Sequence, residues 1–331
     1  MSESFTQSSW TEKDPPFDTS LRPKKLTDFL GQEALKTRLG VFIEAARQRK
    51  EPLGHILFHG PPGLGKTTLA NILSQEMGTH LITTSGPTIE KAADLAGLLT
   101  NLEEGDILFI DEIHRLNRAI EEYLYPAMED FSLDLLIDSG PSSRTVQIKL
   151  KKFTLVGATT RSGLVSGPMR SRFGFSCRLE YYDAETLATI ITCSAQILQV
   201  NVLPEAALEV ARRSRGTPRV ANHLLRWVRD FAQIHHRSPI DLATTHEALH
   251  MLAIDEMGLD EMDKKLLETI IDHHGGGPVG LNTLAIALSE DPSTLSEVYE
   301  PYLVMKGFLR HTPRGREVTK HAYEHLEKEL P

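Results

Sequence analysis

The stretch that decides the fold is LGHILFHGPPGLGKTTLA, residues 53–70. An apolar run ends at Phe58, a glycine-rich loop leads into Gly65-Lys66-Thr67, and helix-favouring residues follow. This order of strand, loop and helix is the context in which a phosphate-binding loop works. Glycines let backbone N–H groups curl around a phosphate, and the helix dipole presents its positive end to the same anion. The stretch therefore predicts a nucleotide site, against the alternative of an ordinary strand-to-helix turn.

Three polar side chains at the end of the loop have separate expected roles. Lys66 would reach the outer phosphates, and the Thr67 hydroxyl would hold Mg²⁺. Thr68 lies one residue further into the same anion site. ATP and Mg²⁺ are thus the expected cofactors.

Length and composition set the class of protein. With 331 residues, 40 % hydrophobic and 24 % charged, the chain suggests two or three globular domains. We expect no membrane association, because no apolar run is long enough to cross a bilayer and residues 1–18 lack the pattern of a secretion signal. Cys177 and Cys193 have no metal-site spacing, so a reducing cytoplasm fits. The net charge of −9 opposes general polyanion binding but permits a local basic patch.

Strand and helix patterns alternate through the first half of the chain. This alternation predicts an α/β domain with a parallel sheet and helices on both faces. The expected strands cover residues 56–58, 80–84, 106–110 and 153–158, and the expected helices cover 33–49, 89–102 and 118–128.

The alternation is interrupted at residues 133–150, where two extended runs flank a Gly-Pro turn. This is a hairpin signal. In its second run Val146, Ile148 and Leu150 alternate with polar residues. An ordinary edge hairpin is one interpretation, and a hairpin whose apolar face docks on a partner is the other.

The remaining sequence is mainly helical. Expected helices at 184–198, 204–213, 218–236 and 242–252 form a helical second domain, and 258–263 is interpreted as a short polar link. Three further helical stretches and a small hairpin with a Thr312–Gly315 turn suggest a winged-helix module. We therefore divide the chain into a lead at 1–20, an ATPase domain at 21–182, a helical domain at 183–256 and a winged helix at 257–331.

Two acids follow the strong apolar strand at 106–110. Ligands collect at the carboxyl ends of parallel strands, so Asp111 and Glu112 should face the phosphate loop. Asp111 would position Mg²⁺ through its water shell, and Glu112 would act as the general base for the attacking water. Acids after a strand are common, but their place after a phosphate loop makes the pattern specific.

Later polar residues fit the same chemistry. Thr160 closes the fourth strand and could contact the γ-phosphate or cap a turn. Arg170 and Arg172 lie on a short helical turn, where they could form a solvated face or reach a neighbouring subunit's nucleotide. Arg219 follows Thr217-Pro218 in the first turn of a helix, where a cation opposes the helix dipole. A nearby anion, either the γ-phosphate or an acid, would explain it.

The third domain carries the main nucleic-acid signal. Residues 302–320 hold five Lys or Arg and one acid, Glu317, a local charge of +4 in an acidic protein. Arg314 and Arg316 flank the turn tip, where they could reach a phosphate backbone. A solvated hairpin is the alternative.

Together these motifs resemble AAA+ ATPases and, more closely, the RuvB family of bacterial Holliday-junction branch-migration motors. The resemblance covers about residues 18–325. Its carriers are LRPKKLTDFLGQE, HGPPGLGKTTLA, FIDEIHRLN, GATTRSGLVSGPMRSRFG, RLEYY, GTPRVANHLLRWVRDFA, GGGPVGLNTLA, EPYLVMKGFL and HTPRGR.

The resemblance implies residue roles. Thr160 matches a first sensor, Arg172 an arginine finger supplied to the neighbouring subunit, and Arg219 a second sensor. Further implied nucleotide contacts are Leu21, Arg22, Gly63, Gly65, Lys66, Thr67, Thr68, Glu129, Asp130, Phe131 and Tyr182, and implied DNA contacts are Arg310, His311, Arg314 and Arg316.

The resemblance also implies a homohexameric ring motor that moves duplex DNA and four-way junctions in recombination, repair and the SOS response. The 133–150 hairpin would dock on a RuvA-like junction-binding protein, and a RuvC-like resolvase is a further possible partner. The family usually has arginine at His311 and near Pro292 and often proline in place of Lys151-Lys152, so DNA contacts are where we expect differences. Alternatives are a clamp loader, a protein remodeller or a nucleotide-gated DNA-binding adaptor with little turnover.

Overall fold

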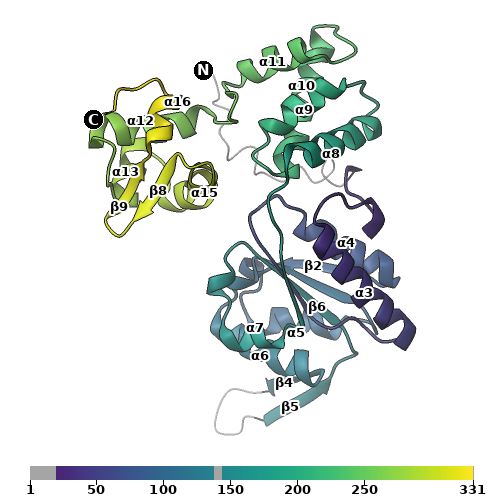
Figure 1. The fold of residues 1–331 in the computed structure, drawn as a ribbon. Coiled ribbons are helices and arrows are strands. Elements are labelled where there is room, and N and C mark those ends of the chain that lie inside the picture. Colours follow the sequence, from purple (N-terminus) through teal and green to yellow (C-terminus); the bar gives the residue numbers. More distant parts are fainter. Residues whose placement is uncertain (1–19, 138–143, 331) are drawn as a thin grey trace. The chain divides into compact units, whose positions relative to one another are not determined.

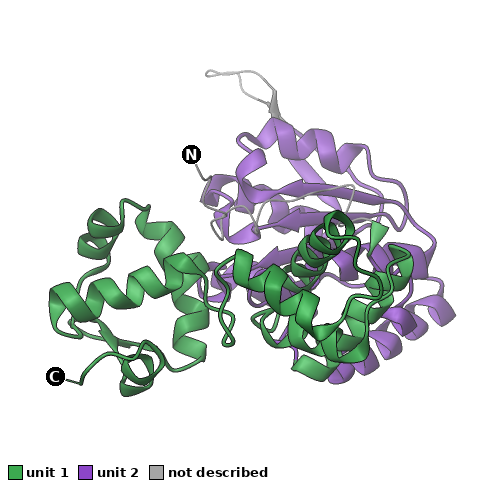
Figure 2. Cartoon of the chain, turned by 90° about the horizontal axis from the view of Figure 1, so that it is seen from above, with its two compact units in different colours: residues 1–21, 183–331 green, residues 22–182 purple. Residues whose placement is uncertain are grey.

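A computed structural model describes residues 20–137 and 144–330. The chain forms two compact units, one of residues 22–182 and one that contains the described residues from 183 onward (Figure 2). No helix in the described ranges combines the length and the apolar composition that crossing a membrane requires.

A five-stranded parallel sheet forms the centre of the first unit (Figure 1). The strand order is β2-β3-β6-β1-β7, so β6 lies between β3 and β1. The prediction missed β7, a short edge strand that pairs only with β1 and whose alternate residues are exposed. The strands are β1 (Ile56–His59), β2 (Leu81–Ser85), β3 (Ile107–Asp111), β6 (Thr154–Thr159) and β7 (Phe175–Arg178).

Helices cover both faces of the sheet. Successive strand side chains point to opposite faces, and β3 and β6 are buried along their length, as a sheet covered on both sides requires. The expected helix at 89–102 is shorter in the structure and starts at Ala92, because Asp94 Oδ2 accepts hydrogen bonds from the backbone N–H groups of Glu90 and Lys91 at 3.1 and 2.9 Å. The helices are α3 (Glu33–Arg49), α4 (Lys66–Met77), α5 (Ala92–Thr100), α6 (Arg118–Glu129) and α7 (Gly167–Arg172).

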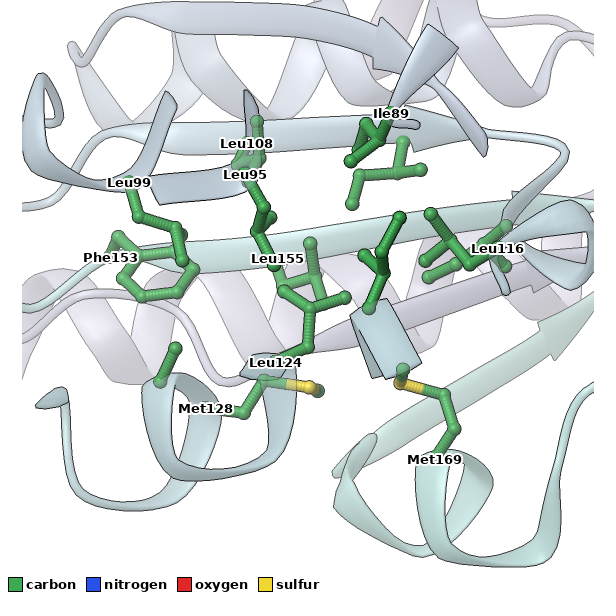
Figure 3. Packing of buried hydrophobic residues seen from close by; sticks show 14 of the residues in the cluster. Ile89, Leu95, Leu99, Leu108, Leu116, Leu124, Met128, Phe153, Leu155 and Met169 are labelled. Carbon is green, nitrogen blue, oxygen red and sulfur yellow. The ribbon is translucent and has the colours of Figure 1, made fainter. Parts of the chain in front are cut away.

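The core on one face of this sheet joins three helices to the strands (Figure 3). Side chains of α5, α6 and α7 pack there against residues of β3 and β6. This shared core fixes the position of α7 relative to α6. Its members include Leu95, Leu99, Leu108, Leu124, Met128, Phe153, Leu155 and Met169.

The expected hairpin is present as β4 (Ser132–Ile137) and β5 (Arg144–Lys149), which pair antiparallel. Its turn, 138–143, lies outside the described residues. Leu150 packs against the core and Ile148 is half-buried, whereas Val146 is 42 % exposed. The alternating apolar residues therefore become more exposed away from the sheet.

The second unit is helical apart from one hairpin. Asp183, Thr217, Asp241 and Asp260 each cap a helix with a side-chain oxygen. The last helix, α16, was not predicted. The elements are α8 (Ala184–Ile197), α9 (Pro204–Arg212), α10 (Pro218–Ile234), α11 (Leu242–Met251), α12 (Glu261–His274), α13 (Leu281–Leu288), α14 (Pro292–Thr294), a π turn (Leu295–Tyr299), α15 (Glu300–Met305), β8 (Leu309–Thr312), β9 (Gly315–Val318) and α16 (Lys320–His325).

The interpretation of residues 258–263 as a polar link was wrong. Leu259 and Asp263 are fully buried, and Asp260 is 3 % exposed. Leu259 belongs to the winged-helix core, and both carboxylates form ion pairs with Arg215 from the loop before α10. The segment looked like a linker because its acids have their cation far away in the sequence.

Candidate nucleotide site and basic wing

The phosphate loop between β1 and α4 depends on its glycines. Gly60, Gly63 and Gly65 have positive φ values of 139°, 78° and 101°. A Cβ at Gly60 would lie 2.6 Å from the Leu179 carbonyl oxygen, and one at Gly65 would lie 3.0 Å from the Phe29 ring. Other residues would therefore strain the backbone and collide with their surroundings.

Lys66 is folded into this loop. Its Nζ donates hydrogen bonds to the carbonyl oxygens of Gly60 and Pro61, both at 2.8 Å, and the residue is 7 % exposed. Thr67 and Thr68 follow in the first turn of α4 and are half-buried. The loop thus gathers its cation and its hydroxyls around the helix N-terminus, where an anion is favoured.

The carboxyl ends of β3 and β6 bring two predicted site residues together. Asp111 ends β3, and its Oδ1 accepts from the Glu112 backbone N–H at 3.1 Å. Thr160 follows β6, and its Oγ1 donates to Glu112 Oε2 at 3.2 Å. Because β6 neighbours β3, a candidate base and a candidate sensor meet across 48 residues of sequence.

His114 and Thr159 also belong to this group and were missed as site residues. The His114 Nδ1 lies 3.2 Å from Glu112 Oε2 and 2.9 Å from Thr159 Oγ1. Thr159 is fully buried. A histidine two residues after the Asp-Glu pair was the available signal, but its contact with Thr159 requires the strand order.

Tyr182 contacts the phosphate loop from the end of the unit. Its hydroxyl donates to the Leu64 carbonyl oxygen at 3.4 Å, and burial raises the pKa of this phenol. Leu21 is buried and Arg22 is half-buried. Nucleotide contacts of Leu21 and Arg22 stay predictions.

Arg172 lies against α6 of its own subunit. Its Nη2 is 3.1 Å from Glu129 Oε1, and its Cζ is 4.3 Å from the centre of the Tyr125 ring. Within the described ranges no hydrogen bond or ion pair connects it to the phosphate loop. Asp130 is exposed, whereas the Phe131 ring packs against Phe153 with a centroid distance of 5.9 Å.

Arg219 lies in the second unit, in the first turn of α10. The Thr217 hydroxyl accepts from the Val220 backbone N–H and caps this helix. Arg219 is half-buried, and no ion pair to it is found among the residues that the structure describes. Its contact with a nucleotide stays a prediction.

The basic wing carries more negative charge than the sequence count suggested. Glu300, which is 1 % exposed, accepts from Arg316 Nε at 2.8 Å and lies 2.9 Å from His311 Nε2. Arg310 pairs with Glu317 at 2.7 Å. Arg314 at the turn is exposed and pairs with no acid in the described part of the chain. The +4 estimate omitted Glu300, which lies outside the hairpin but binds two of its side chains.

Three family models match consecutive parts of the chain. The Holliday junction DNA helicase RuvB P-loop domain matches residues 21–179, the RuvB AAA lid domain matches 182–255, and the RuvB C-terminal winged helix domain matches 256–327. The chain belongs to the RuvB family. This membership confirms both the resemblance and the predicted fold class: a P-loop domain with a parallel sheet, a helical lid and a winged helix.

Known RuvB proteins are similar over almost the full chain. The RuvB subunit of the Holliday junction branch migration complex from Protochlamydia amoebophila is 63 % identical over 326 residues, covering 98 % of each protein. The corresponding Flavobacterium psychrophilum subunit is 58 % identical over 323 residues, covering 98 % of this chain and 95 % of the relative. The solved Thermotoga maritima RuvB branch migration motor has 51 % identity and a TM-score of 0.87, covering 94 % of this chain and 100 % of that one.

Proposed function

We propose that this protein is an ATP-driven motor that moves the branch point of Holliday junctions. The proposal rests on the contact at the carboxyl ends of β3 and β6. There Thr160 donates a hydrogen bond to Glu112, and the complete phosphate loop follows the neighbouring strand β1. The same chain contains the lid and winged helix of the RuvB family. For its domain limits we propose 21–182, 183–256 and 257–331, with 1–20 as a lead.

The phosphate loop would bind the nucleotide. Backbone N–H groups around Gly63 and Gly65 would face the phosphates, and Lys66 would exchange its two carbonyl partners for phosphate oxygens. Thr68 would add its hydroxyl to the same site. The lysine is held ready inside the loop, so little reorganisation accompanies binding.

The donor set fits Mg²⁺ bound together with a nucleotide. The Thr67 hydroxyl and the Asp111 carboxylate are hard oxygen ligands, and the described residues contain no group of three or more acidic, His or Cys side chains that would hold a metal alone. A magnesium ion at the phosphates supplies neutralisation of their charge. Asp111 would act through the ion's water shell.

Glu112 would orient and deprotonate the attacking water. Thr160 and His114 both contact its Oε2, which fixes the carboxylate at the end of β3. Thr160 would report the γ-phosphate to the base by changing partner between phosphate and carboxylate. The ends of β3 and β6 would thus act together in activating the attacking water.

The remaining nucleotide contacts that we propose follow the family resemblance, and one of them comes from a neighbouring subunit in a homohexamer. Leu21, Arg22 and Tyr182 would contact base and ribose, and Arg219 would contact the γ-phosphate. Arg172 would reach the neighbour's nucleotide and stabilise charge on the transferred phosphoryl group. Glu129 pairs with Arg172, and the stretch Glu129-Asp130-Phe131 would face the same nucleotide.

The wing would contact duplex DNA through Arg310, His311, Arg314 and Arg316. Contacts to phosphates fix position without reading sequence and weaken as salt rises. The 133–150 hairpin, with its exposed Val146, would dock on a RuvA-like junction-binding protein. A RuvC-like resolvase would act on the same junction.

The test is the ATPase rate and the movement of a synthetic four-way junction, with and without the junction-binding partner, for wild type and Glu112→Gln. We expect the variant to bind ATP but lose hydrolysis and junction movement together. ATP hydrolysis by wild-type rings without any junction movement would leave an ATPase and reject branch migration. Junction binding by wild type with negligible hydrolysis would favour the adaptor.

A further inference from the structure

One face of α6 is built around α7, the helix that carries Arg172. Glu121, Tyr125 and Glu129 are spaced four residues apart, so they lie one above another on a helix. All three contact α7 or its capping residue. The two helices also share the apolar core shown in Figure 3, with Met128 from α6 and Met169 from α7. The polar contacts are therefore held on a rigid base.

The Tyr125 ring is fixed by its hydroxyl. This hydroxyl donates to Glu121 Oε2 at 3.0 Å, and the Ser166 hydroxyl donates to the same oxygen at 2.6 Å. Ser166 in turn caps α7 by accepting from the Met169 backbone N–H. Burial raises the pKa of Tyr125, so its phenol stays a donor across the neutral range. The ring orientation and the start of α7 are thus set by one carboxylate.

Burial of the Glu121 carboxylate is unfavourable for the stability of the fold. It is 7 % exposed, and no cation forms an ion pair with it in the described residues. A buried carboxylate without a cation lowers stability compared with an apolar side chain of similar size. Its two hydroxyl partners are the phenol beneath Arg172 and the cap of the helix that carries Arg172. This loss of stability is explained if the activity of the protein depends on the position of Arg172.

The guanidinium of Arg172 is oriented but not saturated. It lies over the Tyr125 ring at 4.3 Å, donates from Nη1 to the Pro168 carbonyl oxygen at 2.7 Å and pairs with Glu129 through Nη2. Its Nε is buried and has no hydrogen-bond partner among residues 20–137 and 144–330. The Glu129 side chain is 53 % exposed, so this ion pair can be exchanged for another anion at low cost.

We propose that Tyr125, locked by Glu121, is the platform that positions Arg172 for the nucleotide of the neighbouring subunit. The inference rests on the proposed role of Arg172 in the neighbour's site. A catalytic group works when its rotamer is restricted by packing and by hydrogen bonds of the residues behind it. Tyr125 is a positioning residue, because it contacts the arginine and not the reacting atoms.

The test uses mixed rings, because a group that acts on the neighbour can be separated from one that acts in its own subunit. Tyr125→Leu removes the platform, Tyr125→Phe keeps the ring but removes the lock, and Arg172→Ala removes the finger. Each is assayed alone and mixed in equal amounts with Lys66→Ala, which lacks its own ATP site but supplies an intact Tyr125 and Arg172. Energy transfer between differently labelled subunits verifies mixing.

For Tyr125→Leu alone we expect ATP turnover to fall about 10- to 100-fold with little change in KM, because the defect concerns the transition state. Tyr125→Phe should show a smaller loss of ATP turnover, because it keeps the ring under Arg172. Mixing Tyr125→Leu or Arg172→Ala with Lys66→Ala should restore part of the turnover. In such rings about a quarter of the interfaces combine an intact phosphate loop from one subunit with an intact Arg172 and Tyr125 from its neighbour. Tyr123→Leu is the matched control, since Tyr123 is half-buried on the same helix and packs against the core.

The outcomes distinguish the positioning role of Tyr125 from the proposed role of Arg172 in the neighbouring site. If Arg172→Ala is rescued and Tyr125→Leu is not, Tyr125 acts in its own subunit and the platform is rejected while the finger stands. If verified mixing rescues neither variant, the finger itself is rejected and the platform with it. Full turnover of Tyr125→Leu alone, or an equal loss in Tyr123→Leu, also overturns the platform.

Discussion

Arg172 in the first unit and Arg215 in the second are both withdrawn from solvent, but their surroundings differ. The Arg172 side chain is 19 % exposed and pairs with one acid, Glu129, that is itself 53 % exposed. The Arg215 side chain is 4 % exposed and pairs with two buried acids, Asp260 and Asp263. Each also lies near an aromatic ring. An ion pair at the surface is easily exchanged, whereas a buried one is costly to break.

The difference in burial between these ion pairs supports different roles for the two arginines. Arg172 can leave its acid when another anion approaches. Arg215 joins the loop before α10 to the start of α12, and its Nε also donates to the Gly258 carbonyl oxygen at 2.8 Å. It therefore holds the lid to the winged helix within the second unit. The Arg172 ion pair is exposed enough to be exchanged, as its proposed role requires, whereas the Arg215 ion pairs are buried.

The largest expected effect comes from removing the buried cation. Arg215→Leu leaves two buried carboxylates without their partner, and we expect it to lower the free energy of unfolding by about 3–5 kcal/mol. Arg172→Leu should cost less than about 1 kcal/mol, because Glu129 can be solvated. Urea unfolding followed by far-UV circular dichroism reports on both units and compares the two variants, and Trp227 fluorescence in a Trp10→Phe background follows the second unit separately.

Arg212→Leu is the control for this comparison, since Arg212 is exposed at the end of α9. It should unfold like wild type. Equal losses for Arg215→Leu and Arg172→Leu would show that burial does not distinguish the two ion pairs.

A comparable effect is expected from pH. Two buried carboxylates share one guanidinium, and burial raises the pKa of Asp263 from 3.8 to about 7. The folded state then binds this proton more tightly than the unfolded state. The stabilisation is fully present below about pH 4 and is lost as pH rises through about 7, with a slope of at most about 1.4 kcal/mol per pH unit.

Asp263→Asn removes this titration while Asp260 still pairs with Arg215. Unfolding free energies of wild type and variant, measured between about pH 4.5 and 7.5, should converge at low pH and separate at high pH in favour of the variant. Parallel profiles would contradict the raised pKa.

The smallest effect extends the comparison to the wing. Arg314 is exposed, whereas Arg316 pairs with the buried Glu300. Arg314→Gln should weaken duplex binding to all sequences and reduce the slope of log Kd against log salt by about 1, with unchanged stability. Arg316→Gln should also lower the unfolding temperature, because Glu300 loses a partner. Fluorescence anisotropy at several salt concentrations and thermal unfolding measure both, and loss of stability in Arg314→Gln would remove the distinction.

Local sequence patterns predicted much of the local structure of the candidate site. The phosphate loop is recognisable because glycine conformations and the following helix are set by adjacent residues. Asp111 and Glu112 could be placed because a strand end is a local feature. Tyr125 and His114 were not predicted as site residues, because the contacts that define their roles join parts of the chain that are far apart in the sequence. The β7 strand was missed because it is short and half exposed.

The sequence by itself determined the phosphate loop, the helix caps, the fold class and the membership of the RuvB family. These depend on backbone conformation and on side chains within about one helical turn of each other. Only the tertiary structure decided that Thr160 meets Glu112 and that Arg215 meets Asp263, each across 48 residues. Strand order and helix packing create such contacts, and ion pairs become permanent or exchangeable according to the burial that the complete fold gives them.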